Sequence, residues 1–178
     1  ANDEAGHVVA KTLPDGETNT YAYDGKGNLL AEASSTGRAF MRTYDELCRM
    51  TSETDADGIT TSFAYDGADR ISQTDALGNV TTYAYDAMGR QISVTDPSGN
   101  TSRTSYDAMG RVVAEVDGTG ATTRYLLDAR GLLMALVEGT GSVTSFTYDA
   151  AANMTSMTDA AGGVWTYAHD GVGNCISE

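Results

Sequence analysis

Nine aspartates recur at an almost constant interval along the chain. Successive members lie 21 residues apart seven times and 20 residues apart once. They are Asp3, Asp24, Asp45, Asp66, Asp86, Asp107, Asp128, Asp149 and Asp170. Carboxylates at fixed phase could share calcium ions, as in nonapeptide repeats that place Asp and Gly in facing loops. Because that short spacing is absent, we expect these aspartates to cap turns and predict no metal site and no cofactor.

Acid–base or nucleophilic catalysis would need one group that its surroundings set apart from the others. The aspartates instead recur in equivalent settings, and no serine differs from the Ser/Thr background. His169 stands where most repeats have Tyr, and His7 stands where they have Arg or Asn, so both are interpreted as repeat substitutions. The sequence therefore predicts no catalytic residue and a protein that is not an enzyme.

Two cysteines are too few for a disulfide scaffold or a zinc site. Cys48 replaces a turn glycine and Cys175 an apolar strand residue, about six repeats later. On an open ribbon of strands at ~4.8 Å they would be roughly 58 Å apart, far beyond disulfide reach. We expect two unpaired thiols.

The elements that position these groups are set by the repeat. The dipeptide Tyr-Asp marks six of the nine phases, and a glycine follows each of the first eight aspartates by thirteen residues, or by twelve in the shortened repeat. The marker tyrosines are Tyr23, Tyr44, Tyr65, Tyr85, Tyr106 and Tyr148, and the glycines are Gly16, Gly37, Gly58, Gly78, Gly99, Gly120, Gly141 and Gly162. Asp initiates turns and Gly supplies positive φ, so each repeat contains two turns, and Gly99 and Gly120 are expected to have positive φ.

The segments between turns alternate in the manner of strands. Phe63 and Tyr65 alternate with Ser62 and Ala64, which gives one aromatic face and one small, polar face. An apolar residue follows most marker aspartates by five, and this row includes Met50, Ile71 and Val112. We predict an all-β antiparallel meander of roughly 17 strands, two per repeat, with no helix.

Composition restricts the partners. The 178 residues carry 11 Lys and Arg against 25 Asp and Glu, a formal charge of −14. Such a surface is unfavourable for nucleic-acid phosphates and anionic lipid. No apolar run approaches the ~20 residues of a membrane span, and the first four residues do not resemble a signal peptide. The sequence begins and ends within a repeat, so we expect a piece of a longer protein.

These motifs resemble the RHS or YD repeat, whose pattern is Tyr-Asp, two residues, Gly-Arg, an apolar residue, then Thr-Asp-x-x-Gly-Asn and Tyr-x-Tyr-Asp. Residues 85–90 and 95–100 follow it closely, as do residues 106–111, and the resemblance spans the chain from residue 1 to residue 178. It implies a segment of the spiral β-shell, or cocoon, of bacterial polymorphic toxins and insecticidal toxin complexes, with relatives in teneurins. The shell would enclose a C-terminal toxin used against competitor or host cells.

The resemblance also implies partners and a location. The partners would be the remaining repeats and the enclosed toxin, and the longer protein would be secreted or delivered by a bacterial secretion system. Shells of this family often end in an Asp-Pro autocleavage segment. Asp96-Pro97 occupies an ordinary turn phase and is followed by further repeats, so it is interpreted as a turn.

Aromatic rows leave an alternative open, an extracellular carbohydrate-binding or adhesion module. Stacked aromatics can bind sugars, but cross-strand packing also explains them. The rows comprise Tyr21, Phe63, Tyr83, Tyr125, Phe146, Tyr167 and the marker tyrosines. Trp165 is the best single candidate for contact with a glycan or a partner.

Two further expectations concern geometry. The first turns after Asp45 and Asp66 lack their glycine and are expected to be looser. Seventeen strands at ~4.8 Å would close into a ring only ~25 Å across, too narrow for a folded toxin domain. We therefore expect an arc or coil of a larger shell, whose edge strands lead the isolated chain either to self-associate or to require neighbouring repeats.

Overall fold

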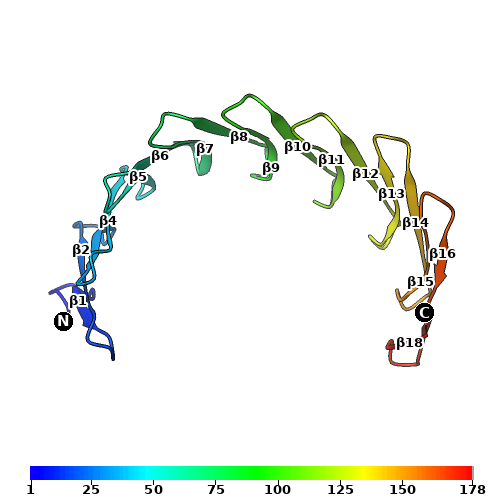
Figure 1. The fold of residues 1–178 in the computed structure, drawn as a ribbon, viewed down its shortest axis with the longest axis horizontal. Helices are drawn as coiled ribbons and strands as arrows, with labels where there is room; N and C mark the ends of the chain where they lie inside the picture. The colour runs from blue at the N-terminus through cyan, green and yellow to red at the C-terminus, as the bar shows by residue number, and fades with distance from the viewer. Residues whose placement is uncertain (178) are drawn as a thin grey trace. The chain divides into compact units, whose positions relative to one another are not determined.

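The computed structural model of the chain describes residues 1–177, so Glu178, the last residue of the predicted array, lies outside the described residues. Residues 1–177 form strands and turns and no helix (Figure 1), and hence no helix able to cross a membrane. The predicted all-β antiparallel meander is confirmed.

The chain divides into two compact units, residues 1–83 and residues 84–178, with the boundary inside one strand. The first unit contains β1 (Ala10–Thr12), β2 (Thr18–Tyr23), β3 (Leu29–Ser34), β4 (Ala39–Tyr44), β5 (Met50–Asp55), β6 (Thr60–Asp66), β7 (Asp69–Thr74) and most of β8 (Val80–Tyr85). The second contains β9 (Gln91–Thr95), β10 (Thr101–Tyr106), β11 (Val112–Val116), β12 (Thr122–Leu127), β13 (Leu133–Glu138), β14 (Val143–Tyr148), β15 (Met154–Thr158), β16 (Val164–Thr166), β17 (Ala168–His169) and β18 (Cys175–Ser177).

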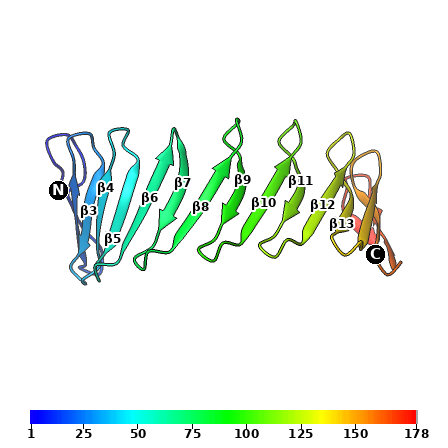
Figure 2. The same ribbon diagram turned by 90° about the horizontal axis from the view of Figure 1, so that it is seen from above.

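Strand order follows chain order. The sheet runs from β1 to β16, and β17 and β18 form a separate hairpin. Strands β1 and β16 stand at the two ends of that order and do not pair with each other within residues 1–177, so the sheet is open. Within the second unit, the turns β10–β11 and β12–β13 lie along one edge and the turns β9–β10 and β11–β12 along the other (Figure 2). We call these the first-turn and second-turn edges.

Both kinds of turn use the same backbone geometry. At the second turn of Asp96, the Gly99 amide donates to the Asp96 carbonyl at 3.0 Å, and the Asp96 amide donates to the Asn100 carbonyl at 2.9 Å. Gly99 has φ of 88° and Gly120 of 89°, so both predicted positive φ values are confirmed. These are hairpin loops in which a type I turn is followed by a left-handed bulge residue.

The expectation of a looser turn after Asp45 is wrong. Cys48 adopts the glycine conformation with φ of 62°, and its amide donates to the Asp45 carbonyl at 3.1 Å. Ala152 does the same with φ of 69°. The capped loop therefore holds a non-glycine residue in the left-handed backbone conformation, although that conformation costs such a residue free energy.

The turn after Asp66 is tighter than its equivalents, which also contradicts the sequence expectation. Asp66 pairs directly with Asp69, and Gly67, with φ of 55°, supplies the only positive φ of the two-residue loop. This is the pattern of a type II′ hairpin. The shortened repeat therefore lacks one residue in the turn and not in a strand. As a result Arg70, four residues after its marker Asp, pairs with Tyr65 in the way that Met50, five residues after its marker Asp, pairs with Tyr44. Ile71 is therefore a bulge residue and does not belong to the predicted apolar row.

Register divides the strand residues between two faces. In the second unit Thr104 pairs with Glu115, and Tyr106 pairs with Val112. We call the face of Tyr106 the tyrosine face. The alternate positions, such as the pair Ser105 and Ala114, form the small-residue face. The same division holds in the first unit, where Phe63 and Tyr65 alternate with Ser62 and Ala64.

One sheet with two open faces leaves almost nothing fully buried. Within residues 1–177 only Ala135 is buried, at 9 % exposure, and no polar residue is buried. Although the length would permit a conventional core, none forms. Stability therefore comes from cross-strand pairs and from side chains that connect neighbouring hairpins, as in other repeat proteins.

Candidate functional site

The marker aspartates close the first turns with their side chains. In the second unit, Asp86 Oδ1 accepts from the amides of Met88 at 2.9 Å and Arg90 at 3.1 Å, while Asp86 Oδ2 accepts from Arg90 Nε at 2.7 Å. The side chain of one residue thus satisfies two backbone donors of a loop that carries few backbone bonds. Second-turn aspartates do the same, as Asp96 does for Ser98 and Asn100.

These bonds favour the ionised carboxylates. The side chain of Arg90 holds the pKa of Asp86 below its ordinary value, and the amide and then the guanidinium of Arg111 lower the pKa of Asp107. At Asp24 the Asn28 side chain has the largest effect in the same direction. Each of these carboxylates accepts hydrogen bonds from its own turn, and its surroundings are nearly the same from repeat to repeat.

Arginines four residues after the marker Asp connect adjacent first turns. Arg90 stacks over the Tyr106 ring at 4.6 Å, and its Nη1 donates to the Asp107 carbonyl at 3.3 Å. Arg49 stacks over Tyr65 at 4.7 Å and donates to the Gly67 carbonyl. Each of these side chains therefore links one hairpin to the turn of the next.

The marker tyrosines make a second connection in the opposite direction. Tyr44 Oη donates to the Leu29 carbonyl at 3.0 Å, and Tyr65 Oη donates to the Met50 carbonyl at 2.8 Å, each acceptor lying 15 residues earlier. Equivalent bonds join Tyr23 to Val8, Tyr106 to Gln91 and Tyr148 to Leu133. Tyr85 ends β8 at the same phase. These hydroxyls are used for contacts between hairpins.

His7 makes the same two contacts as these arginines, one with a turn carboxylate and one with a tyrosine ring. Its Nδ1 lies 3.0 Å from Asp3 Oδ2, and its ring stacks on Tyr23 with centroids 4.8 Å apart. The ring thus occupies the position that Arg90 takes between Asp86 and Tyr106. His169 pairs with Cys175 across the last hairpin. Within residues 1–177, neither histidine ring forms the hydrogen bond to a serine or cysteine side chain that joins a nucleophile to its base.

The remaining predicted candidates are distributed over the chain. Cys48 and Cys175 are free and exposed. Asp96-Pro97 forms an ordinary second turn. Trp165 lies on the tyrosine face of β16, opposite Met157, and keeps 38 % of its surface exposed. Within residues 1–177 no group of three or more His, Cys, Asp or Glu side chains is arranged to hold a metal ion.

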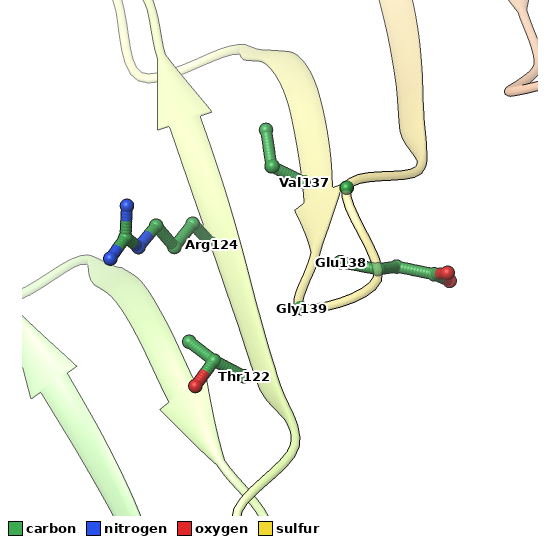
Figure 3. Close-up of a pocket in the computed structure, with 6 residues that line it drawn as sticks. Thr122, Arg124, Val137, Glu138 and Gly139 are labelled. Carbon is green, nitrogen blue, oxygen red and sulfur yellow. The ribbon is translucent and has the colours of Figure 1, made fainter.

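An open hollow lies beside β12 and β13 in the second unit. Thr122, Arg124, Val137, Glu138 and Gly139 line it, and the Arg124 and Glu138 side chains point away from each other (Figure 3). It therefore lacks the converging polar groups of an enzyme site.

Sequence reasoning missed the arginine connections as functional positions. Their signal was present, because Arg49 and Arg90 both follow a marker Asp by four residues. Two other arginines, Arg103 and Arg124, each follow a marker Asp by seventeen residues and so occupy equivalent positions of successive repeats. The sequence period therefore already indicated one shared face, which the strand register confirms.

The periodic turns, the connections between hairpins and the open single sheet define a β-hairpin repeat array, a structural class of protein. The chain belongs to the RHS repeat family. The family, described as the RHS Repeat, matches residues 3–39, 44–74, 71–101, 89–122 and 128–164. No curated protein matches the chain.

Solved structures share the fold. The crystal structure of TcdB2-TccC3-Cdc42 matches with a TM-score of 0.62 at 16 % identity, over 99 % of this chain and 12 % of that chain. The Photorhabdus luminescens Tc holotoxin pore matches with a TM-score of 0.58, also at 16 % identity, over 99 % of this chain and 12 % of that one. TcdB2-TccC3 gives 0.58 at 16 % identity, over 99 % and 13 %. The chain thus spans about an eighth of the chains that it matches.

Proposed function

We propose that the chain is a non-catalytic wall segment of an Rhs-type shell that encloses a toxin. The observation that carries this proposal is the open sheet of RHS hairpins over nearly the whole chain, joined on both sides by Arg and Tyr contacts. Its fold is that of segments in Tc holotoxin chains. A wall segment needs one face toward the cavity, one face toward solvent and end strands that neighbouring repeats can extend. None of these features requires a catalytic group.

The function of the whole assembly follows from this role. The longer protein would be exported by a bacterium, and the segment's partners would be neighbouring repeats and the enclosed polypeptide. The wall would exclude protease and solvent from that polypeptide until delivery.

Cysteine accessibility tests the wall. Ser102 and Ser105 are both exposed serines of β10, on the tyrosine face and the small-residue face respectively. Each is changed to Cys in the longest reading frame that contains these residues, with Cys48 and Cys175 changed to Ser. A polyethylene-glycol maleimide should react at one position only in the folded protein, and at both in urea. Equal rates at both positions in the folded protein would refute a closed wall.

A glycan-binding module is the second candidate, because Trp165 is partly exposed beside Met157 on the tyrosine face. Glycan-array binding by the 178-residue chain that disappears in Trp165→Ala would favour it. Since Tyr44, Tyr65, Tyr106 and Tyr148 donate their hydroxyls to backbone carbonyls, the marker tyrosines offer fewer polar contacts to a sugar. We therefore prefer the wall.

A further inference from the structure

Charged strand residues are divided unequally between the two faces. Within residues 1–177, all four glutamates inside strands lie on the tyrosine face: Glu32 pairs with Tyr21, Glu53 with Arg42, Glu115 with Thr104 and Glu138 with Thr123. Two of them are engaged there. Glu53 accepts from Arg42 at 2.7 Å, and Glu115 accepts from the Tyr125 hydroxyl at 2.6 Å.

The small-residue face of the second unit carries no carboxylate among its described strand positions. Its paired positions in β9 to β16 are Ser, Thr, Ala, Val and Leu, apart from Arg103 and Arg124. Two arginines are the only charged side chains in this set. In a chain of net charge −14, this face is locally cationic.

Arg103 and Arg124 are exposed, and neither forms an ion pair or a side-chain hydrogen bond within residues 1–177. The other three arginines of the second unit, Arg90, Arg111 and Arg130, each bind a turn aspartate. The two free guanidinium groups therefore have no structural use that explains their position. Arg124 extends from β12 away from Glu138 (Figure 3).

Register gives the spacing of the pair. Arg103 lies opposite Val116 on β11, and Arg124 lies opposite Ala114 on the same strand. The two arginines are thus two strands apart and displaced by two residues along them. With ~4.8 Å between strands and ~3.4 Å per residue, their backbones are roughly 12 Å apart. In an extended peptide, side chains four residues apart face the same way and span about 13 Å.

We infer that the small-residue face of the second unit binds an extended polypeptide segment that carries carboxylates, through Arg103 and Arg124. The guanidinium forks match carboxylates in geometry and charge, and the small neighbours leave them accessible. Elsewhere the negative surface repels an acidic segment, so this face is where it can approach. The inference rests on the proposed function, because the enclosed polypeptide would be the occupant.

Side-chain NMR of the 178-residue chain tests this inference without a shell. The probe is a Gly/Ser peptide with two glutamates four residues apart, and its control has glutamines instead. The Nε–H signals of Arg103 and Arg124 should shift and saturate with the glutamate peptide only. Arg103→Gln and Arg124→Gln should each weaken binding roughly 2- to 5-fold, as expected for exposed charge pairs. Lys11→Gln, an equal charge change on the tyrosine face of the first unit, should leave binding unchanged.

Three results would overturn the inference. The first is equal shifts at Arg38 and Arg130, which would show only general charge attraction. The second is an equal response to the glutamine peptide. The third is a response to a sulfated disaccharide with none to the glutamate peptide, which would assign the pair to an anionic glycan. The chain can fail this test and still pass the cysteine test of the wall, since the latter does not depend on Arg103 or Arg124.

Discussion

At the scale of single residues, the left-handed position of each turn is fixed by the bonds around it. The Gly99 amide donates a hydrogen bond to the Asp96 carbonyl. The Asp96 side chain accepts from the amides of Ser98 and Asn100, the residues on either side of Gly99. An added Cβ at Gly99 would meet nothing within 4 Å. Any cost of substitution there must therefore come from backbone conformation and not from steric overlap.

Gly99→Val should destabilise the protein by about 1–2 kcal/mol, because a β-branched residue is disfavoured at positive φ. Gly99→Asn should cost less, since Asn tolerates this region. Asn100→Ser, which leaves the backbone bonds intact, should change little. The midpoint of urea denaturation measures all three. Equal midpoints for the Val and Ser variants would show that this turn does not require positive φ.

Marker tyrosines offer a matched comparison. Tyr44→Phe removes the half-buried bond to the Leu29 carbonyl and should cost about 0.5–1.5 kcal/mol. Tyr21 lies on the same face two strands away, and its hydroxyl forms no hydrogen bond within residues 1–177. Tyr21→Phe should therefore leave the unfolding midpoint unchanged. If both variants lose the same stability, ring packing rather than the hydroxyl explains the marker tyrosine.

At the scale of elements, the contact between hairpins matters more than either hairpin alone. Arg90 belongs to the turn of Asp86 but stacks on Tyr106 and reaches the Asp107 carbonyl. A single hairpin is marginal in water, so each repeat depends on its neighbours.

Arg90→Lys should weaken this connection. Lysine keeps the charge but loses the planar stack and the paired donors, and the stack on Tyr106 alone is worth about 0.5–1 kcal/mol. Arg103→Lys, on the small-residue face and without a partner, is the control and should not change thermal stability. A midpoint for Arg90→Lys equal to that of Arg103→Lys would mean that the stack contributes nothing.

Strands and turns could be predicted from the sequence because their cause is local. The alternation of Phe63 and Tyr65 with Ser62 and Ala64 fixes a strand, and Asp96 with Gly99 fixes a turn. The position of the missing residue after Asp66 could not be predicted, because counting shows that a repeat is short but not whether the turn or the strand is shorter. The observed pairing of Tyr65 with Arg70 shows that the turn is the shorter element.

The candidate site was predicted only in part for the same reason. The marker tyrosines and aspartates are visible as a repeat, but a bond from Tyr44 to Leu29 depends on the lateral distance between hairpins. Arg103 and Arg124 are 21 residues apart, one full repeat, so their equivalence was visible in the sequence. The sequence could not show that neither guanidinium has an ion-pair or hydrogen-bond partner within residues 1–177, because that depends on the side chains that surround it.

At the scale of the whole molecule, charge gives stability a predictable dependence on pH. Turn carboxylates such as Asp86 and Asp24 have lowered pKa values when folded, through Arg90 and Asn28 respectively. Their contribution is therefore complete above the unfolded pKa of about 3.9 and is lost as pH falls through the lower folded values. Against this, the net charge of −14 at pH 7 is self-repelling and vanishes near the pI of about 4.3.

Thermal melting followed by circular dichroism should show both effects. The Tm should stay level or rise between pH 7 and about pH 4.5, as repulsion falls, and should drop below about pH 3.5, as the turn carboxylates are protonated. High salt should remove the rise, because it screens repulsion, and should leave the drop. A Tm that declines steadily from pH 7 to pH 4.5 would contradict this account.

Open sheet ends give the last prediction. Strands β1 and β16 each have three residues. Ala1 bonds both backbone groups of Ala10 on the outer side of β1, whereas β16 is fully exposed and ends the sheet within the described residues. Such edges pair with other chains unless charge prevents it. The 178-residue chain should therefore self-associate, with a mass from small-angle scattering that rises with concentration.

Val164→Lys places a charge on the end strand β16 and should reduce association. Val143→Lys makes the same change one repeat earlier, on the internal strand β14, and should not. A constant monomer mass at all concentrations, or equal effects of the two variants, would show that these edges are not where copies of the chain meet.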